Sequence, residues 1–258
     1  MLTIEEKKNI QIVFSRLDAI LKEKSELGID ANFAIDFIQH NPWAGDTIVH
    51  LKQMLEMNFG YKPIRWVSDG NLKAYHGYYT APNTLGDIPL LCTDGLRIEN
   101  SIVQEHLDAL MPMPEDQLQN SIAGDGNGEK EVTDETRAKI KAVVKRFLDH
   151  VLNRGRLVEI NNLVSSEYVY HNENDGALKG REVLIDHIKN KMGGKMQHDN
   201  KLLLTSGDLV MAHSHYFGDN ERVVFDWFRI DDGLIAEHWS VEQAIEPWEN
   251  VANEHPHF

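Results

Sequence analysis

The strongest constraint in this sequence is an internal repeat. Three pairs of segments match in the same order along the chain, at offsets of 131, 137 and 138 positions: Phe37–Pro42 with Tyr168–Glu173, Ser68–Tyr79 with Thr205–Tyr216, and Thr93–Glu99 with Asp231–Glu237. A repeat at a nearly constant offset marks a structural unit that occurs more than once. The sequence therefore predicts two tandem copies of one domain.

Length and composition agree with two copies. The 258 residues are 41% hydrophobic, which is enough for a packed core in each of two domains. A net charge of -15 argues against a nucleic-acid partner, since phosphate binding requires clustered Lys and Arg. The single cysteine, Cys92, rules out an internal disulfide and suits a buried apolar position. No membrane-spanning run and no export signal are visible, so we expect a cytoplasmic protein without a membrane partner.

Each copy is expected to begin with helices and to continue with strands. Apolar residues at helical spacing predict a first helix over Ile4–Lys24 in one copy and, after Thr133, over residues 134–151 in the other. A second helix is predicted over Asp46–Asn58 and over Arg181–Met192. Four strands of the second copy are indicated by β-branched and aromatic residues between turn signals: Leu202–Leu204, Leu209–Phe217, Arg222–Ile230 and Leu234–Val241. This order predicts an α+β fold with helices packed on a curved antiparallel sheet.

Domain boundaries follow from composition. Residues 119–132 contain Ser121–Lys130, a stretch rich in Gly, Asp and Asn without apolar periodicity, which is typical of a surface linker. We therefore expect a first domain over residues 1–118, a linker over 119–132 and a second domain over 133–250. Residues 251–258 are predicted to be a tail.

The segment Val223–Trp239 is typical of a β-hairpin, and its register decides which side chains meet. A two-residue turn at Asp232-Gly233 would mix apolar and charged side chains on both faces. A three-residue turn with Gly233 in a left-handed bulge position gives one apolar face. Its cross-strand pairs are Ile230–Leu234, Phe228–Ala236 and Asp226–His238. This register predicts a hydrogen-bonded acid/base pair, Asp226 and His238, at the end of an apolar concave face.

Other side chains are candidates for the same pocket. Those expected to contact substrate are His171, which closes an earlier apolar segment, Phe228 on the hairpin, and three residues that alternate along one strand, Met211, His213 and His215. The H-x-H pair also permits a metal site with His171 or Asp226 as third ligand, but two alternating histidines are a weak signal and no metal is expected. The structural alternative is that Asp226 and His238 only satisfy each other at the end of a sheet.

The His-Asn pair and the run Asp226–Trp239 resemble the SnoaL-like group of polyketide cyclases and aldol-condensation enzymes, over about Thr133–Pro247. The resemblance implies the cone-shaped nuclear-transport-factor-2-like fold, in which helices and a curved sheet enclose a pocket. It also implies an aspartate that acts as acid and base in ring closure without metal or organic cofactor, which maps onto Asp226 or the neighbouring His238.

Copy one departs from this pattern. Under the offset of 138 positions, Asp226 corresponds to Ile88 and His238 to Asn100, so the acid/base pair is expected only in the second copy. SnoaL-like domains commonly pair sheet against sheet, which suggests an intrachain pseudo-dimer, as a monomer or a homodimer. Two functions stay open at this point. One is cofactor-independent acid/base chemistry on a small apolar carbonyl compound, and the other is a module that binds a small apolar ligand, or serves as a scaffold, without chemistry.

Overall fold

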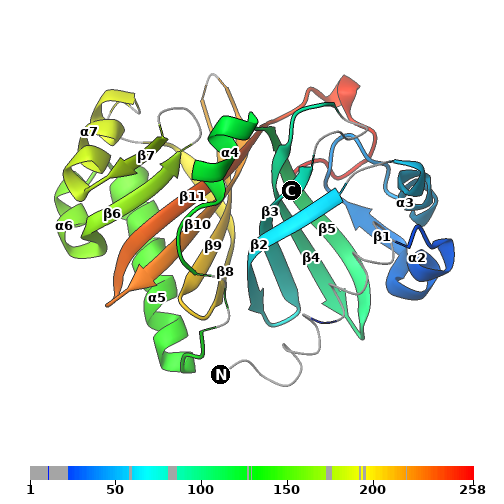
Figure 1. Cartoon of the computed structure of the whole chain (residues 1–258), viewed down its shortest axis with the longest axis horizontal. Coiled ribbons are helices and arrows are strands. Elements are labelled where there is room, and N and C mark those ends of the chain that lie inside the picture. The colour runs from blue at the N-terminus through cyan, green and yellow to red at the C-terminus, as the bar shows by residue number, and fades with distance from the viewer. Residues whose placement is uncertain are drawn as a thin grey trace. The chain divides into compact units, whose positions relative to one another are not determined.

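The computed structural model describes residues 11, 23–57, 60–80, 86–126, 128, 130–172, 176–191, 193, 196–218 and 220–258. The helix predicted over Ile4–Lys24 lies outside the described residues, except for residues 11, 23 and 24. The chain divides into two compact units (Figure 1). The first unit consists of Leu2–Pro114 together with Ile245–Phe258, and the second unit consists of Glu115–Ala244. None of the described helices is long and apolar enough to cross a membrane.

The first unit is built on a five-stranded sheet in the order β1-β5-β4-β3-β2. Its elements are α2 (Glu26–Asn32), β1 (Phe33–Gln39), α3 (Ile48–Gln53), the 3-10 turn η1 (Met54–Glu56), β2 (Gly60–Asp69), β3 (Leu72–Thr80), β4 (Leu90–Glu99) and β5 (Ile102–Pro112). The strands pair antiparallel except β1, which lies parallel to β5. A core around Ile29, Phe37 and Leu51 joins α2 and α3 to one face of this sheet. We call it the inner face.

The second unit has a six-stranded sheet in the order β7-β6-β11-β10-β9-β8. Its helical elements are α4 (Glu115–Ile122), α5 (Asp134–Arg146), the π-helical segment η2 (Phe147–Leu152), the 3-10 turn η3 (Leu157–Glu159), α6 (Ile160–Leu163) and α7 (Arg181–Lys191). Its strands are β6 (Val164–Asn172), β7 (Gly176–Lys179), β8 (His198–Ser206), β9 (Leu209–Tyr216), β10 (Arg222–Asp231) and β11 (Leu234–Ala244). The predicted α+β class is confirmed, with β6 lying parallel to β11 in an otherwise antiparallel sheet.

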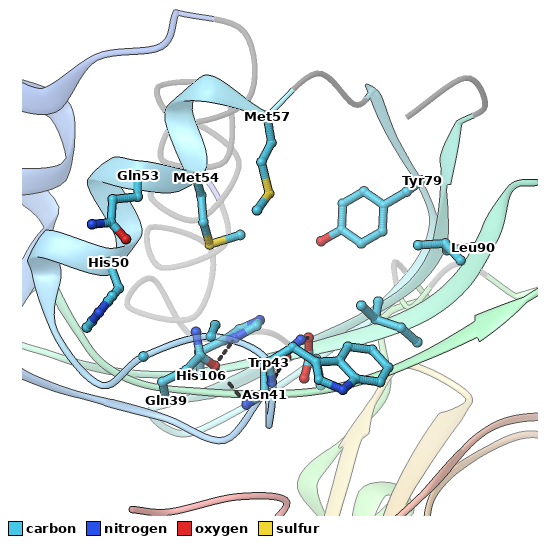
Figure 2. Close-up of a pocket in the computed structure, with 14 residues that line it drawn as sticks. Gln39, Asn41, Trp43, His50, Gln53, Met54, Met57, Tyr79, Leu90 and His106 are labelled. Atoms are coloured by element: carbon cyan, nitrogen blue, oxygen red, sulfur yellow. Dashed lines mark hydrogen bonds between the residues drawn. The ribbon is translucent and has the colours of Figure 1, made fainter. Parts of the chain in front are cut away.

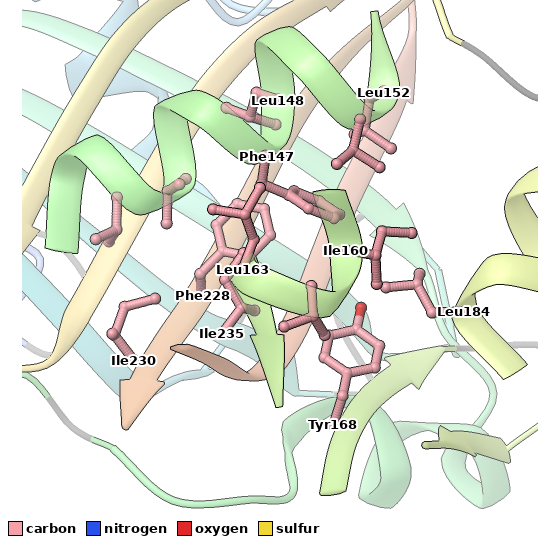
Figure 3. Close-up of a cluster of buried hydrophobic side chains, with 14 of the residues drawn as sticks. Phe147, Leu148, Leu152, Ile160, Leu163, Tyr168, Leu184, Phe228, Ile230 and Ile235 are labelled. Atoms are coloured by element: carbon pink, nitrogen blue, oxygen red, sulfur yellow. The ribbon is translucent and has the colours of Figure 1, made fainter. Parts of the chain in front are cut away.

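Helix α5 forms where the sequence predicts it because its start and its apolar face are both defined. Thr133 is the N-cap, and its hydroxyl accepts a hydrogen bond from the Thr136 N–H, which satisfies a backbone donor that the first turn leaves unpaired. Ile140, Val144 and Phe147 then recur at helical spacing and are buried. Figure 3 shows Phe147 and Phe228 together in the core between this helix and the sheet. This packing fixes the helical layer over the inner face of β10 and β11.

The two units share one topology. Strands β1, β5, β4, β3 and β2 follow the same order and directions as β6, β11, β10, β9 and β8. The last hairpin of each sheet also has the same turn, with positive φ at Asn100 and Ser101 in the first unit and at Asp232 and Gly233 in the second. A bulge follows at the same place, between Arg97 and Ile98 or between Arg229 and Ile230. The two hairpins are therefore equivalent, at an offset of 132 positions.

The register predicted for the β10–β11 hairpin is wrong. The turn has two central residues, Asp232 and Gly233, both with positive φ, which is the conformation that joins twisted strands most directly. Asp231 pairs with Leu234, and the bulge then shifts the partner of every earlier residue by one position. Asp226 consequently lies opposite Ser240, and His238 lies opposite Phe228. The predicted direct pair Asp226–His238 is a diagonal pair.

The segments expected to be a linker and a tail are both packed. Residues 115–122 of the connection form α4, and the Ala123 carbonyl accepts a hydrogen bond of 2.7 Å from the Trp239 indole. The Asp125 N–H donates to Glu237 at 3.3 Å, so this stretch covers part of the outer face of the second sheet. The C-terminal residues belong to the first unit, together with the 3-10 turn η4 (Trp248–Asn250). These boundaries differ from the expected ones because backbone hydrogen bonds hold residues that show no apolar periodicity.

Gly77 on β3 offers a test of the first sheet. A Cβ at this position would lie 2.3 Å from the Lys62 carbonyl oxygen and 2.9 Å from the Pro63 Cα, both backbone atoms of β2. We expect Gly77→Ala to lower the free energy of unfolding by about 1–3 kcal/mol, as overpacking does. Gly95→Ala on β4 is the matched control, because its nearest neighbour atom is at an ordinary 3.5 Å. Urea unfolding followed by circular dichroism measures both variants, and equal stability of the two would contradict the β2–β3 packing.

Candidate functional site

In the second unit, Asp226 and His238 lie on the inner face and touch. The bulged register puts both even-numbered residues on that face, and His238 Nε2 donates to Asp226 Oδ1 at 2.8 Å. Both side chains are buried. His238 is stacked between the rings of Tyr170 and Phe228, whose centroids are 4.5 and 4.4 Å away. The sequence thus predicted the contact correctly and its register incorrectly.

The hydrogen bonds of this pair are complete. Asp226 Oδ1 also accepts from Ser240 Oγ at 2.5 Å, and Oδ2 accepts from the Tyr216 hydroxyl at 2.9 Å. The Tyr168 hydroxyl lies 3.0 Å from His238 Nδ1. Burial alone would raise the pKa of Asp226, but the hydrogen bond and charge of His238, with Ser240 and Tyr216, outweigh it and lower the pKa. A carboxylate held by three donors is stabilised in its charged form and is a weak base.

Little space adjoins this pair. The cavity lined by Asp226, His238 and Ser240 has a volume of about 40 Å³. A water molecule occupies about 30 Å³ in the liquid, so the space is close to that of one solvent molecule. In the second unit, Asp226 and His238 thus have complete hydrogen bonds and adjoin only a very small cavity.

Most of the other predicted contact residues lie on the opposite face of the second sheet. Met211, His213 and His215 pair with Trp227, Phe225 and Val223, all on the outer face. His171 donates to Glu237 at 2.9 Å and stacks on Trp239, also on the outer face. Only Phe228 shares the inner face with the pair, because strand residues alternate between faces and a shift of one position reverses the assignment. The structure therefore removes these four residues from the pocket.

The first unit contains the counterpart of the pair, which corrects the expectation that copy one lacks it. At the offset of 132 positions Asp94 corresponds to Asp226, and His106 corresponds to His238. His106 Nε2 lies 3.3 Å from Asp94 Oδ1, which also accepts from the Tyr79 hydroxyl at 3.0 Å. One position differs in kind. Asp108 stands where the second unit has Ser240, so it lies directly opposite Asp94.

Asp108 makes the first site a charged cluster instead of a satisfied pair. Asp108 Oδ2 accepts from Asn41 Nδ2 at 2.6 Å, while Oδ1 has no hydrogen-bond partner in the part of the chain that the structure describes. His106 Nδ1 faces Gln39 Oε1 at 2.8 Å, so both ring nitrogens face oxygen acceptors and the doubly protonated ring satisfies both. Ligand-type atoms of Asp94, His106 and Asp108 all lie within 4.8 Å of one another. Among the described residues this group, not His213 and His215, has metal-like spacing.

A larger cavity opens beside this cluster. Its volume is about 190 Å³. Figure 2 shows Met54, Met57 and Tyr79 pointing into it from opposite sides, with Gln39 and His106 along its base. The lining also includes Asn41, Trp43, Ala44, Gly45, His50, Gln53, Leu90, Asp108 and Leu110. The cavity is therefore apolar over most of its wall and carries an acid and an imidazole at one end.

The pKa values of two members of the cluster, Asp108 and His106, are raised. Burial raises the pKa of Asp108 to about 6 from 3.8, and the charge of Asp94 adds to this effect against the opposing influence of His106, Asn41 and His40. Burial alone would lower the pKa of His106, but its hydrogen bond to Asp94 and the charges of both carboxylates raise it overall. An acid and a base with pKa values moved toward neutrality in one apolar cavity is the arrangement that proton-transfer sites require.

The sequence did contain the signal for this site. Residues 97–106 read Arg-Ile-Glu-Asn-Ser-Ile-Val-Gln-Glu-His and residues 229–238 read Arg-Ile-Asp-Asp-Gly-Leu-Ile-Ala-Glu-His, without a gap. The offset of 138 positions aligned two Asp-Gly pairs, of which only Asp232-Gly233 is a turn, since Asp94-Gly95 lies inside β4. The true offset falls from 137 to 132 because five more residues separate Tyr79 from Leu90 than separate Tyr216 from Arg222.

Comparison with known proteins finds similarity to parts of this chain. A family model described as a SnoaL-like domain matches residues 144–238. No curated protein matches the chain significantly. Solved structures that resemble part of the chain include a candidate ketosteroid isomerase from Kribbella flavida, with 19% identity over 43% of this chain and 83% of that one and a TM-score of 0.39. A candidate polyketide cyclase from Bacillus cereus is 22% identical over 43% and 79%, also at 0.39. An NTF2-like protein of unknown function from Mesorhizobium loti is 19% identical over 44% and 98%, at 0.38.

The family match falls on the second unit, from the last turn of α5 to His238 on β11. These residues contain the helical layer, the parallel pair of strands and the bulged hairpin described above. The second unit of this chain is a SnoaL-like domain.

Proposed function

We propose that this chain is an acid/base catalyst that acts on a small, largely apolar carbonyl compound, and that its reaction pocket lies in the first unit at Asp108 and His106. The observation that carries the proposal is a buried carboxyl with a pKa of about 6 at the end of an apolar cavity. A base of this strength is half ionised close to neutral pH, which combines the correct protonation state with a useful driving force for proton transfer.

The chemistry follows from the placement of the two groups. Ionised Asp108 accepts a proton from the carbon next to the substrate carbonyl, and the electrons of that C–H bond pass into an enolate. The positive charge of His106 stabilises the negative oxygen of the enolate. The enolate carbon then either takes a proton back, which gives proton exchange or epimerisation at that carbon, or attacks a second carbonyl carbon, which closes a ring. In the second case Asp108 returns its proton to the new alkoxide.

The cavity limits the size of the substrate. An engineered cavity of roughly 150 Å³ lined by apolar side chains binds benzene. The cavity of the first unit is about 190 Å³ and has one polar end. A compound of one or two small rings with a single carbonyl group at that end fits these dimensions.

The second unit supports a different role for its pair. Its carboxylate has three donors, its pKa is lowered, and its cavity is about 40 Å³. We propose that Asp226 and His238 hold β9, β10 and β11 together as a buried polar network. Their catalytic role, which the sequence suggested, stays a prediction that the same experiments test.

The proposal predicts that the protein catalyses deuterium exchange into 2-indanone, a small bicyclic ketone, in D₂O. Exchange requires only removal and return of a proton next to the carbonyl, so it does not depend on knowing the natural substrate. We expect Asp108→Asn to lower the catalysed rate at least about a hundredfold, the usual contribution of a general base. The catalysed rate should rise with pH through about 6, as Asp108 ionises. Proton NMR of the ketone measures both effects.

Two controls make this test decisive. Asp87→Asn changes an exposed aspartate of the first unit and should leave the exchange rate unchanged. Asp226→Asn should also retain exchange in the first pocket. Loss of exchange in Asp226→Asn but not in Asp108→Asn would move the active site to the second unit. Tight binding of the ketone without exchange would favour a ligand-binding module without chemistry.

The two aspartates should also affect stability with opposite signs. Asp108 has a raised pKa in the folded state, so its stabilising contribution is present below about pH 4 and is lost as the pH rises through about 6. Asp108→Asn removes this loss and should raise the melting temperature at pH 8. The corresponding gain in the free energy of unfolding is up to about 3 kcal/mol, for a pKa shift of about two units. At pH 4 the gain should disappear.

Asp226→Asn should do the reverse. Its pKa is lowered, so the ionised group contributes stability above the unfolded value of 3.8 and loses it as the pH falls through its folded value. An amide cannot accept from all three donors, and each unsatisfied buried donor costs about 1–3 kcal/mol. The melting temperature of Asp226→Asn should therefore fall at pH 8. Thermal unfolding by circular dichroism of the full chain measures both variants, and a change of the same sign in both would contradict the distinction between the two sites.

A further inference from the structure

The C-terminal segment of the chain, Ile245–Phe258, packs on the first unit although it follows the last strand of the second. We call it the C-terminal strap. It lies against residues 40–47, a loop without helix or strand between β1 and α3, which we call the pocket loop. Four residues of the pocket loop, Asn41, Trp43, Ala44 and Gly45, line the cavity of about 190 Å³. One wall of the candidate pocket therefore lies next to the end of the chain.

Backbone carbonyls of the pocket loop accept hydrogen bonds from the strap. The Ala252 N–H donates to the Pro42 carbonyl at 2.7 Å, and the His257 N–H donates to the His40 carbonyl at 2.8 Å. Asn253 Nδ2 donates to the carbonyls of both Asn41 and Ala44, at 2.6 and 2.8 Å. The Glu254 N–H reaches Asp46 Oδ2 at 2.8 Å. Irregular backbone needs such partners to hold one conformation, because it has no ladder of its own.

The Asn41 side chain connects the pocket loop to the cluster of Asp94, His106 and Asp108. The Asn41 backbone carbonyl accepts a hydrogen bond from Asn253, and the Asn41 side-chain Nδ2 donates to Asp108 Oδ2 at 2.6 Å. The Asn41 N–H also donates to Gln39 Oε1 at 3.0 Å, the atom that faces His106 Nδ1. Asn253 is nearly buried, so its donors have few alternative partners in solvent. A chain of direct hydrogen bonds thus joins the strap to Asp108 and His106 of the cluster.

A second connection runs through His40. Its Nδ1 donates to the His255 carbonyl of the strap at 2.6 Å, and its Nε2 lies 2.7 Å from Glu105 Oε1 on β5. The hydrogen bond from His40, with Arg97, lowers the pKa of Glu105 to about 2 in spite of burial. The groups that influence Asp108 are therefore Asp94 on β4, His106 on β5, and His40 and Asn41 in the pocket loop.

We propose that the C-terminal strap is a working part of the first unit's pocket, with Asn253 as the positioning residue that holds Asn41 against Asp108. The inference rests on the proposed function only for the role of Asp108. It assigns to the end of the chain a function that neither the fold class nor the family match implies. The pocket is completed by a segment that begins 133 residues after the end of β5 (245 − 112 = 133).

The test compares Asn253→Ala and Asn253→Asp with Glu249→Gln. The aspartate keeps the size of asparagine but cannot donate to the two carbonyls, whereas Glu249 is an exposed strap residue on η4. Carbon NMR of the Asp108 carboxyl measures its pKa in the full chain. Both Asn253 variants should raise this pKa by about 0.5–1 unit, because a weakened hydrogen bond from Asn41 stabilises the carboxylate less. Glu249→Gln should leave it unchanged.

The second readout is the binding of 2-indanone, followed by chemical-shift titration. We expect the Asn253 variants to bind it about fivefold more weakly, since the pocket loop supplies part of the wall. An unchanged Asp108 pKa and unchanged ketone binding in the Asn253 variants would overturn the proposal, even if the melting temperature were lower. A wild-type Asp108 pKa and wild-type ketone binding in Asn253→Asp would overturn it as well, even if Asn253→Ala changed both. Shifted values in a protein that shows no deuterium exchange would support the strap and refute the proposed catalysis.

Discussion

A single β-bulge in each terminal hairpin determines the chemistry of both units. Without the bulge, the two-residue turn at Asp232-Gly233 would pair Asp226 with Trp239 and place His238 on the other face of the sheet. The extra residue after the turn shifts the register by one position, so that carboxylate and imidazole share the inner face. The first unit has the same bulge and the same result, with Asp94 and His106 on its inner face. Bulges next to functional sites commonly redirect a side chain in this way.

One difference in side chain then separates the two units. Ser240 donates to Asp226 and completes its hydrogen bonds, whereas Asp108 at the same position adds a second buried carboxylate. Burial raises the pKa of Asp108, and the charge of Asp94 directly opposite on the neighbouring strand adds to this effect. A buried carboxyl with a raised pKa and an unpaired oxygen is expected where a protein carries out proton transfer. In the second unit the hydrogen bonds of Asp226 and His238 are complete, as is typical of a buried structural pair.

The two units share one topology but differ in the space that they leave for a ligand. The unit that matches the SnoaL-like family model has the smaller cavity, and the unit outside the match has the larger one. Resemblance in sequence follows the elements that build the fold, such as α7 and the β10–β11 hairpin. Space for a ligand depends instead on what the helices and loops leave open over the inner face, which a few substitutions can change.

The sequence by itself determined the repeat, the α+β class, the helix that begins after Thr133, four strands of the second copy and the contact between Asp226 and His238. These features depend on local periodicity, turn residues and short-range pairing. Only the tertiary structure decided the register, the face on which His171, His213 and His215 lie, and the equivalence of Asp94 with Asp226. A bulge of one residue reverses every side chain of a strand, and nothing in a single sequence reports where it occurs. The docking of residues 245–258 on the first unit was also beyond sequence reasoning, since it depends on backbone hydrogen bonds between segments about 210 positions apart.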